Sequence, residues 1–267
     1  MRIIYNQKSH GNSDDTEGHI ARALKELGHE VVDGGQGDLY LFHKDFNPPP
    51  YFQGKIACWY FDKVDYAPSR HVRIPFIKDV LREADFLFMT DQTWAMANPN
   101  PKIHILRQGI GDPTPGTFEE RNIDVAFVGS PYDGREPWCQ AMTEKYGDRF
   151  KIYSRKFNND LNDLCASVPI FTCPEYPSDD FYWSNRVYLL VGSGAFLIHP
   201  YLVGLYEEWG DNLIYYKNME ELHELIAYYL AHPEERERRR KQMYDFCVKN
   251  FTYKKRIEEL IKYVETH

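Results

Sequence analysis

Apolar and polar positions follow two alternating patterns along the chain. Short runs of apolar, β-branched and aromatic residues, such as KIACWYFD at 55–62, predict strands that are covered on both faces. Between such runs, apolar residues recur every three or four positions, as at Ile20, Leu24 and Leu27, and this spacing predicts helices. Because strands and helices alternate, the sequence predicts an α/β fold with parallel sheets.

The alternation occurs in two blocks. The first has predicted strands at 2–6, 31–33, 38–43, 55–62, 85–91 and 102–107, and predicted helices at 17–30 and 76–84, with a further candidate after residue 91. The second has predicted strands at 123–130, 150–154, 195–200 and 212–216, an apolar run at 168–173, and predicted helices at 134–147, 160–167, 184–194 and 219–233. The tail is predicted to be helical in two pieces, divided near residues 250–252.

A polar segment rich in glycine and proline separates the two blocks. GIGDPTPGTFEERN at 109–122 contains three glycines and two prolines, which favours a hinge between two packed units. We therefore expect one β/α domain at residues 1–112, a linker at 113–121 and a second β/α domain at 122–248.

Composition narrows the class of protein. Among 267 residues, 32 Lys and Arg face 40 Asp and Glu, and the formal charge of -8 argues against binding nucleic acid or anionic lipid through the overall field. No apolar run approaches the roughly 18 residues of a membrane span, and no secretory leader pattern is present. The five cysteines form no CxxC pair, so we expect reduced thiols in a cytoplasmic protein without a membrane span.

Candidate site residues follow the predicted strands. In an open parallel sheet, ligands bind beyond the carboxyl ends of the strands, where loops lead into helices. The residues at these places are His10, Gly11, Asp62, Gly129, Ser130, Arg135, Lys156, Ser184, Asn185 and Arg186. Each position also has a plain structural interpretation, because a loop after a strand is often only a solvated turn.

The segment around Arg186 carries the most information. Ser184 is a good N-cap residue, but an arginine in the first helical turn is unfavourable with the helix dipole unless an anion lies between them. This conflict indicates a bound anion. Gly129 and Arg135 favour the same ligand, because glycine leaves backbone donors accessible and a guanidinium can hold a diphosphate.

The second block resembles a known family. SNRVY at 184–188, GSGAFLIHPYLVGL at 192–205 and the helical stretch after NLIYY are similar to the C-terminal domain of group 1 glycosyltransferases of the GT-B fold, particularly the CgeB-like branch. The likeness covers about residues 122–264, and DVAFVGS followed by Arg135 fits the opening of that domain. The first half fits only as a pattern, through GHIARALKELGHEVV and ILRQGIGD.

The resemblance implies an architecture and an activity. A GT-B protein has two Rossmann-like domains that face a central cleft, here an acceptor-binding domain at 1–112 and a nucleotide-sugar-binding domain at 122–248. The last helix, at 249–267, is expected to cross back to the N-terminal domain. The implied activity is transfer of a sugar from a nucleotide-sugar donor to an acceptor hydroxyl in the cleft.

The resemblance also assigns roles in donor binding. Arg186, with Ser184 and Asn185, would meet the donor diphosphate, supported by Gly129, Ser130 and Arg135. The residues themselves add two donor-binding candidates: Gly11, where glycine permits close backbone approach to a ligand, and Lys156, which adds positive charge after the next strand. His199, at the end of the strand 195–200, either contacts the sugar or packs beside Pro200.

One position departs from the family pattern. Leu189 stands where many members have a glutamate that grips the donor ribose, and leucine cannot accept those hydrogen bonds. Either Glu207 or Glu208 replaces it, the donor is bound differently, or catalytic activity has been lost. The alternative to an enzyme is therefore a non-catalytic nucleotide- or sugar-binding protein.

Glycosyl transfer needs a neutralised leaving group and, for an inverting reaction, a general base. Arginine, lysine and backbone amides can supply the first without a metal, and no DxD motif stands in a metal-binding context, so we expect no metal and no cofactor beyond the donor. Asp62 is the first choice for the base and His10 the second; a retaining reaction would require neither. The acceptor is open between a glycan, a small molecule and, less favoured by the acidic charge, a modified base in DNA.

Overall fold

The chain forms two compact units. The computed structural model describes residues 1–5, 15–111, 116–131, 134–154, 158–175 and 179–267. Unit 1 comprises Met1–Gly111 together with Phe251–His267, and unit 2 comprises Asp112–Asn250. The last helix therefore belongs to the same unit as the first strand, and the division after residue 250 lies two residues beyond the position expected from the sequence.

Unit 1 is built on a six-stranded parallel sheet with the order β2-β1-β3-β4-β5-β6. Its strands are β1 (Arg2–Ile4), β2 (Glu30–Val32), β3 (Leu39–Phe42), β4 (Lys55–Tyr60), β5 (Phe86–Met89) and β6 (Ile103–Ile105). The continuous apolar runs of the sequence are the central strands β3, β4 and β5, which are almost wholly buried. Each pairing in this sheet is parallel.

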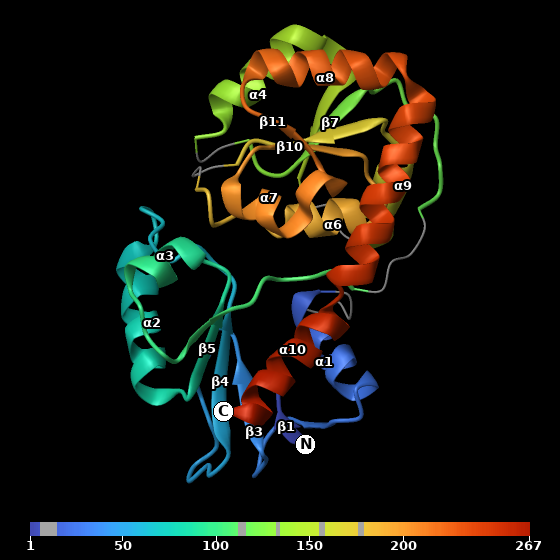
Figure 1. The fold of residues 1–267 in the computed structure, drawn as a ribbon. Helices are drawn as coiled ribbons and strands as arrows, with labels where there is room; N and C mark the ends of the chain where they lie inside the picture. The colour runs from blue at the N-terminus through green and yellow to red at the C-terminus, as the bar shows by residue number, and fades with distance from the viewer. Residues whose placement is uncertain (6–14, 112–115, 132–133, 155–157, 176–178) are drawn as a thin grey trace. The chain divides into compact units, whose positions relative to one another are not determined.

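Helices cover both faces of this sheet. Alternate strand residues such as Leu41 and Trp59 share a core with α1 (Thr16–Glu26) and α10 (Tyr253–Thr266). Their neighbours, such as Phe42 and Cys58, share a second core with α2 (Arg70–Glu83) and α3 (Gln92–Ala97). Figure 1 shows α1 and α10 side by side, although they come from opposite ends of the chain. The period of two along each strand thus produces a three-layer unit.

Two helices differ from the sequence-based expectation. The expected helix at 76–84 begins earlier, at Arg70, and continues through Pro75. Proline usually starts a helix or ends one, because it lacks an N–H donor, so the pattern suggested a start at Phe76. The short helix at Val203–Trp209 was not expected at all.

Unit 2 has a five-stranded parallel sheet with the order β11-β10-β9-β7-β8. Its strands are β7 (Val125–Val128), β8 (Phe150–Tyr153), β9 (Ile170–Thr172), β10 (Leu197–Pro200) and β11 (Ile214–Tyr216). Its helices are α4 (Glu136–Tyr146), η1 (Gly147–Arg149), α5 (Asn158–Ser167), α6 (Arg186–Gly192), α7 (Val203–Trp209), η2 (Gly210–Asn212), α8 (Met219–Ala231) and α9 (Pro233–Asn250). Figure 1 shows α4 and α8 on one side of this sheet and α6 and α7 on the other.

The predicted α/β class with two parallel sheets is confirmed. All five cysteines are buried free thiols. Among the residues described above, no helix combines the length and the apolar character needed to cross a membrane.

Candidate functional site

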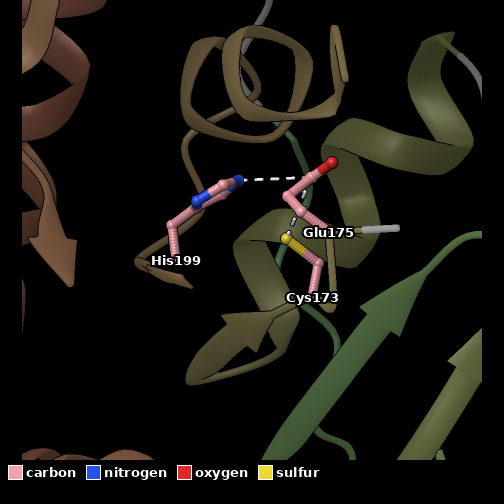
Figure 2. Close-up of side chains that lie close together, drawn as sticks. All are labelled: Cys173, Glu175 and His199. Atoms are coloured by element: carbon pink, nitrogen blue, oxygen red, sulfur yellow. Dashed lines mark hydrogen bonds and ion pairs between the residues drawn. The ribbon is translucent and has the colours of Figure 1, made fainter. Parts of the chain in front are cut away.

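Three neighbouring strands of unit 2 bring polar side chains together at one edge of the sheet. Gly129 directly follows β7, Cys173 and Glu175 follow β9, and His199 lies in the last part of β10. Since β10, β9 and β7 are adjacent and parallel, their carboxyl ends meet at the same edge. Figure 2 shows the side chains of Cys173, Glu175 and His199 gathered there.

Arg186 is held against this group by two contacts. Its Nη1 lies 3.3 Å from Oε1 of Glu175, and its guanidinium carbon lies 5.2 Å from the centre of the Phe127 ring. The Arg186 side chain is 14% exposed and that of Glu175 is 5% exposed. The anion expected from the position of Arg186 is therefore present within the protein, as the Glu175 carboxylate.

His199 is fully buried and contacts two acceptors. Its Nδ1 lies 2.8 Å from the carbonyl oxygen of Pro200 and its Nε2 lies 3.2 Å from Oε1 of Glu175. Burial lowers the pKa of His199, but the neighbouring Cys173 and Glu175 side chains outweigh burial and raise this pKa to about 10. His199 therefore bonds to Pro200 and is buried, and its contact with a sugar stays a prediction.

The charge of Glu175 is kept by its cationic neighbours. Burial raises the pKa of Glu175, but the hydrogen bond from His199 and the charges of Arg186, His199 and Arg135 together lower it. Arg135 directly precedes α4 and is close enough to act on this carboxyl group. The two arginines predicted to bind the donor thus lie around the same carboxylate.

Gly129 makes the close packing around Arg186 possible. A Cβ atom at this position would lie 2.6 Å from the Phe127 ring and 3.2 Å from Nη2 of Arg186. Any side chain would therefore displace the ring or the guanidinium. Ser130, the next residue, is half-buried.

The start of α6 differs in detail from the expectation. The helix begins at Arg186, whose backbone N–H donates to Oγ of Ser184 at 3.3 Å. Asn185 occupies the cap position, and its Oδ1 is buried and has no hydrogen-bond partner among the residues that the structure describes.

The glutamates proposed to replace the missing family carboxylate behave differently. Glu207 is exposed on α7, whereas the Glu208 carboxylate accepts a hydrogen bond from the Tyr188 hydroxyl group of α6. Leu189, next to Tyr188, is half-buried. Of the two glutamates, Glu208 is the one whose carboxylate bonds to α6.

In unit 1, Asp62 lies just beyond β4, as predicted. Its Oδ2 is 3.7 Å from Nη2 of Arg73, and its side chain is 45% exposed. A half-exposed carboxylate remains accessible to an acceptor hydroxyl. His10, Gly11 and Lys156, the other predicted site residues, lie outside the described residues.

His43 and Tyr5 form a buried polar pair at the same edge of the unit 1 sheet. The Nδ1 of His43 lies 2.9 Å from the carbonyl oxygen of Trp59, and its Nε2 lies 2.7 Å from the Tyr5 hydroxyl oxygen. A carbonyl only accepts, so Nδ1 carries the ring proton and Nε2 accepts from Tyr5. Burial, the largest influence, lowers the pKa of His43 to about 4, which keeps the ring neutral at pH 7.

Glu175, Cys173, His43 and Tyr5 escaped prediction from the sequence. His43 directly follows β3 and Glu175 is the third residue after β9, so the carboxyl-end rule that singled out Asp62 could have found both. Tyr5 and Cys173 resemble ordinary core residues, and no sequence signal distinguishes them.

The second half of the chain matches a known family. A family model described as glycosyl transferase-like matches residues 119–262, which is more than half of the chain. The chain belongs to this family. The matched region of this glycosyl transferase-like protein includes Gly129, Glu175, Arg186 and His199. A comparison with curated proteins finds no match.

Solved structures identify the fold. An α-glucosyltransferase in complex with UDP-glucose and DNA containing an abasic site is similar over 98% of both chains, with a TM-score of 0.67 and 10% sequence identity. AviGT4, a glycosyltransferase involved in avilamycin A biosynthesis, is similar over 99% of this chain and 96% of its own, with a TM-score of 0.60 and 11% identity. Sucrose-phosphate synthase from Thermosynechococcus elongatus is similar over 94% of this chain and 77% of its own, with a TM-score of 0.57 and 13% identity. The predicted GT-B fold is confirmed.

Proposed function

We propose that the protein transfers a sugar from a nucleotide-sugar donor to an acceptor hydroxyl group. The observation that carries this proposal is the position of Arg186 beside Gly129 and near Arg135, inside the region that matches the glycosyl transferase-like family. Membership of the CgeB-like branch and a cytoplasmic location stay predictions from the sequence.

Donor binding is proposed to depend on arginine side chains. When the glycosidic bond breaks, negative charge develops on the departing nucleotide diphosphate, and guanidinium groups stabilise it through paired charge-assisted hydrogen bonds. Arg186 and Arg135 would provide these, with Gly129 and Ser130 leaving room for the phosphates. Under this proposal the transfer needs no metal and no further cofactor.

The ion pair between Arg186 and Glu175 suggests how the protein without a donor keeps the partly buried charge of Arg186 neutralised. Glu175 neutralises Arg186 in the structure, and an incoming diphosphate would compete with Glu175 for the guanidinium. His199 bonds to the same carboxylate oxygen, so Glu175 would keep one cationic partner if Arg186 turned toward the donor.

The first experiment measures donor binding. We expect at least one member of a panel of nucleotide sugars to raise the thermal midpoint of unfolding, because a ligand that binds the native state stabilises it. In Arg186→Lys the charge is kept but the planar fork is lost, so we expect donor affinity to fall by about ten-fold or more. Calorimetric titration of the stabilising donor measures this change.

The matched control is Arg149→Lys. Arg149 lies in the same unit at the amino end of β8, is 57% exposed and pairs with Asp124, so donor affinity should stay unchanged. Equal affinity in Arg186→Lys and the wild-type protein would remove Arg186 from the donor site. A panel in which no nucleotide sugar or nucleoside diphosphate binds would contradict the proposed function.

Asp62 is proposed as the general base in unit 1. If the reaction inverts the anomeric carbon, the base removes the proton of the acceptor hydroxyl group and does not contact the donor phosphates. Asp62→Asn should therefore lower the rate of transfer, or of donor hydrolysis, by about 100-fold or more while donor affinity stays unchanged. Turnover equal to that of the wild-type protein would exclude Asp62 from catalysis.

The hydrolysis assay also separates an enzyme from a binding protein. Leu189 is the position that favours the second alternative, because its side chain cannot hold ribose hydroxyls. A donor that binds tightly but is neither hydrolysed nor transferred to any acceptor would indicate a non-catalytic nucleotide- or sugar-binding protein.

A second candidate acceptor is a modified base in DNA. The likeness in fold to an α-glucosyltransferase bound to DNA supports testing it, whereas the formal charge of -8 opposes strong binding through the overall field. A second solved α-glucosyltransferase complex of the same fold holds DNA containing an HMU base. Fluorescence anisotropy with a duplex that carries this base and with an unmodified duplex, at two salt concentrations, tests whether the protein binds modified DNA. Equal weak binding to both duplexes would leave a glycan or a small molecule as the acceptor.

A further inference from the structure

We propose that Cys173, Glu175 and His199 form a zinc-binding site. The three side chains offer a thiol sulfur, a carboxylate oxygen and an imidazole nitrogen that all lie within 4.8 Å of one another (Figure 2). This proposal concerns a metal site in unit 2 and does not depend on the proposed glycosyl transfer.

The separations between the ligand atoms suit a single small cation. Oε1 of Glu175 lies 3.2 Å from Nε2 of His199 and 3.8 Å from Sγ of Cys173. Zinc bonds of about 2.3 Å to sulfur and about 2.0–2.2 Å to nitrogen and oxygen, arranged as a tetrahedron, place such ligand atoms about 3.3–3.6 Å apart. These two separations are within a few tenths of an ångström of those values, and the third, between the ligand atoms of Cys173 and His199, is no more than 4.8 Å.

The orientation of His199 supports a metal ligand. Its Nδ1 donates to the carbonyl oxygen of Pro200 at 2.8 Å, which fixes the ring and directs Nε2 toward Glu175. A hydrogen bond from the far nitrogen to a backbone carbonyl is the usual way in which a protein orients a metal-binding histidine. Nε2 and Oε1 are both electron-pair donors, so a cation must lie between them, either a proton or a metal ion.

The site is anchored and shielded from solvent. Cys173 and His199 are fully buried, and the side chain of Glu175 is 5% exposed. The carbonyl oxygen of Cys173 accepts a hydrogen bond from the Tyr216 hydroxyl group at 2.9 Å, which fixes the backbone at the sulfur ligand. Nη1 of Arg186 lies 3.3 Å from the same oxygen, Oε1, of Glu175. Because a carboxylate has two oxygens, metal binding at Oε1 requires the guanidinium to pair with Oε2 instead.

The mixture of ligands selects the metal. Magnesium and calcium prefer oxygen ligands, whereas zinc accepts thiolate, imidazole and carboxylate together. Three protein ligands leave a fourth position for water or another group, as in zinc sites that are not purely structural. When the metal binds, Cys173 loses its thiol proton and His199 loses the proton at Nε2, because the thiolate and the neutral imidazole are the ligands.

The experiment uses cobalt as a spectroscopic probe for zinc. The full-length protein is reduced, freed of metal with a chelator and titrated with Co²⁺. We expect one equivalent to bind with an absorption band from thiolate-to-cobalt charge transfer and with tetrahedral d–d bands, and we expect Zn²⁺ to displace it. A wild-type protein that shows no such band and binds no stoichiometric Zn²⁺ would overturn the proposal and leave a protonated His199 between the two groups.

Variants assign the ligands. Cys173→Ser should lose the charge-transfer band, and His199→Gln should weaken Zn²⁺ binding by about ten-fold or more. Cys165→Ser is the matched control, because Cys165 is also fully buried in unit 2 but lies outside the cluster. The charge-transfer band of the Cys165→Ser protein should equal that of the wild-type protein. A band that persists in Cys173→Ser would overturn the assignment.

A measurement on the unmodified protein covers the possibility that the variants fail to fold. X-ray absorption of the Zn²⁺-loaded wild-type protein should show one sulfur ligand at about 2.3 Å together with nitrogen and oxygen ligands at about 2.0–2.2 Å. A coordination shell with no sulfur, or with more than one, would contradict the proposal. These readouts are independent of turnover, so a failed zinc site and a failed glycosyl transfer are distinguishable.

Discussion

His43 is a buried imidazole whose two nitrogens are both occupied by neutral partners. The carbonyl of Trp59 and the hydroxyl of Tyr5 fit a neutral ring, and the ring also packs 4.5 Å from Phe61, centre to centre. Protonation would place a charge among buried aromatic groups and would force the Tyr5 hydroxyl to give up its acceptor. The neutral form of His43 is therefore part of the folded structure.

This residue should make the stability of the protein depend on pH. Burial lowers the pKa of His43 in the folded state to about 4, from about 6.5 when unfolded, so the unfolded chain takes up the proton first as the pH falls. The neutral His43 ring gives its full contribution to the free energy of unfolding above about pH 6.5. Between pH 6.5 and 4 this contribution is lost, and the free energy of unfolding falls by about 3 kcal/mol in total. Urea unfolding at several pH values measures the slope.

The control separates His43 from other groups. His43→Asn can still donate to the Trp59 carbonyl but does not titrate, so this part of the slope should disappear. The exposed His71 on α2 provides a matched substitution, His71→Asn, which should leave the slope as in the wild-type protein. Identical slopes in the wild-type protein and His43→Asn would show that His43 does not cause the dependence.

At the scale of the element, α2 contains a proline that costs it a hydrogen bond. Pro75 is the sixth residue of the helix and is exposed, so it contributes little packing, and it offers no N–H to the carbonyl of His71 one turn earlier. The helix persists because Ile77 and Val80 are buried against the sheet. Tertiary packing thus overrides a local preference.

Removing this proline should stabilise the protein. Proline in a helix interior is about 3 kcal/mol less favourable than alanine, and part of that gain is offset because alanine makes the unfolded chain more flexible. We expect Pro75→Ala to raise the free energy of unfolding of unit 1 by about 1–2 kcal/mol, measured by denaturant titration.

Pro233 provides the comparison for this substitution. It is the first residue of α9, where its missing N–H is not needed, so Pro233→Ala should change the stability by less than about 0.5 kcal/mol. A lower free energy of unfolding in Pro75→Ala would contradict this prediction. It would mean that the Pro75 ring stabilises the folded state by more than the missing hydrogen bond costs.

At the scale of the whole molecule, the chain leaves unit 1 and returns to it. The helix α10 buries Ile257, Leu260 and Val264 in the same core as the first strands, and Lys55 donates to the carbonyl oxygen of Val264 at 2.6 Å. The core of unit 1 is therefore complete only when both ends of the chain are in place.

This arrangement predicts a selective loss of stability. Leu260 is fully buried, so Leu260→Ala should lower the free energy of unfolding of unit 1 by about 2–5 kcal/mol. Hydrogen exchange should then increase in β1, β3 and β4, whereas the strands of unit 2 should keep their protection. Glu258→Ala, on the exposed face of the same helix, should have no such effect, and equal increases in both units would contradict the division into two cores.

Much of the fold could be predicted from residue patterns alone. The buried runs of β3, β4 and β5 and the helical spacing of α1 depend on neighbours within a few positions, and such patterns are present in the sequence itself. The glycine- and proline-rich segment at 109–122 separates the blocks for the same local reason. There are two exceptions. Pro75 lies inside α2 although proline locally predicts a helix boundary, and α7 is too short to show a helical period.

The candidate site could be predicted only in part. The rule that ligands bind beyond strand ends led to Gly129 and Arg186 from local sequence, and the structure places the Arg186 guanidinium where a Cβ atom on Gly129 would meet it at 3.2 Å. It did not lead to Glu175, whose importance comes from Arg186 and His199, residues 11 and 24 positions further along the chain. Such pairings depend on the strand order β10-β9-β7, which is not the order along the chain.

Hydrophobic periodicity and turn chemistry act between residues a few positions apart, so residue patterns are enough to establish the α/β class, the two blocks and the cationic residues at the strand ends. The folded chain was needed to identify Glu175 as the anion beside Arg186, to place His199 between a carbonyl and a carboxylate, and to show how α10 completes the core of unit 1. Burial, pKa shifts and ion pairs arise between groups that chain topology brings together, and the sequence around each group does not reveal which distant residues will be its neighbours.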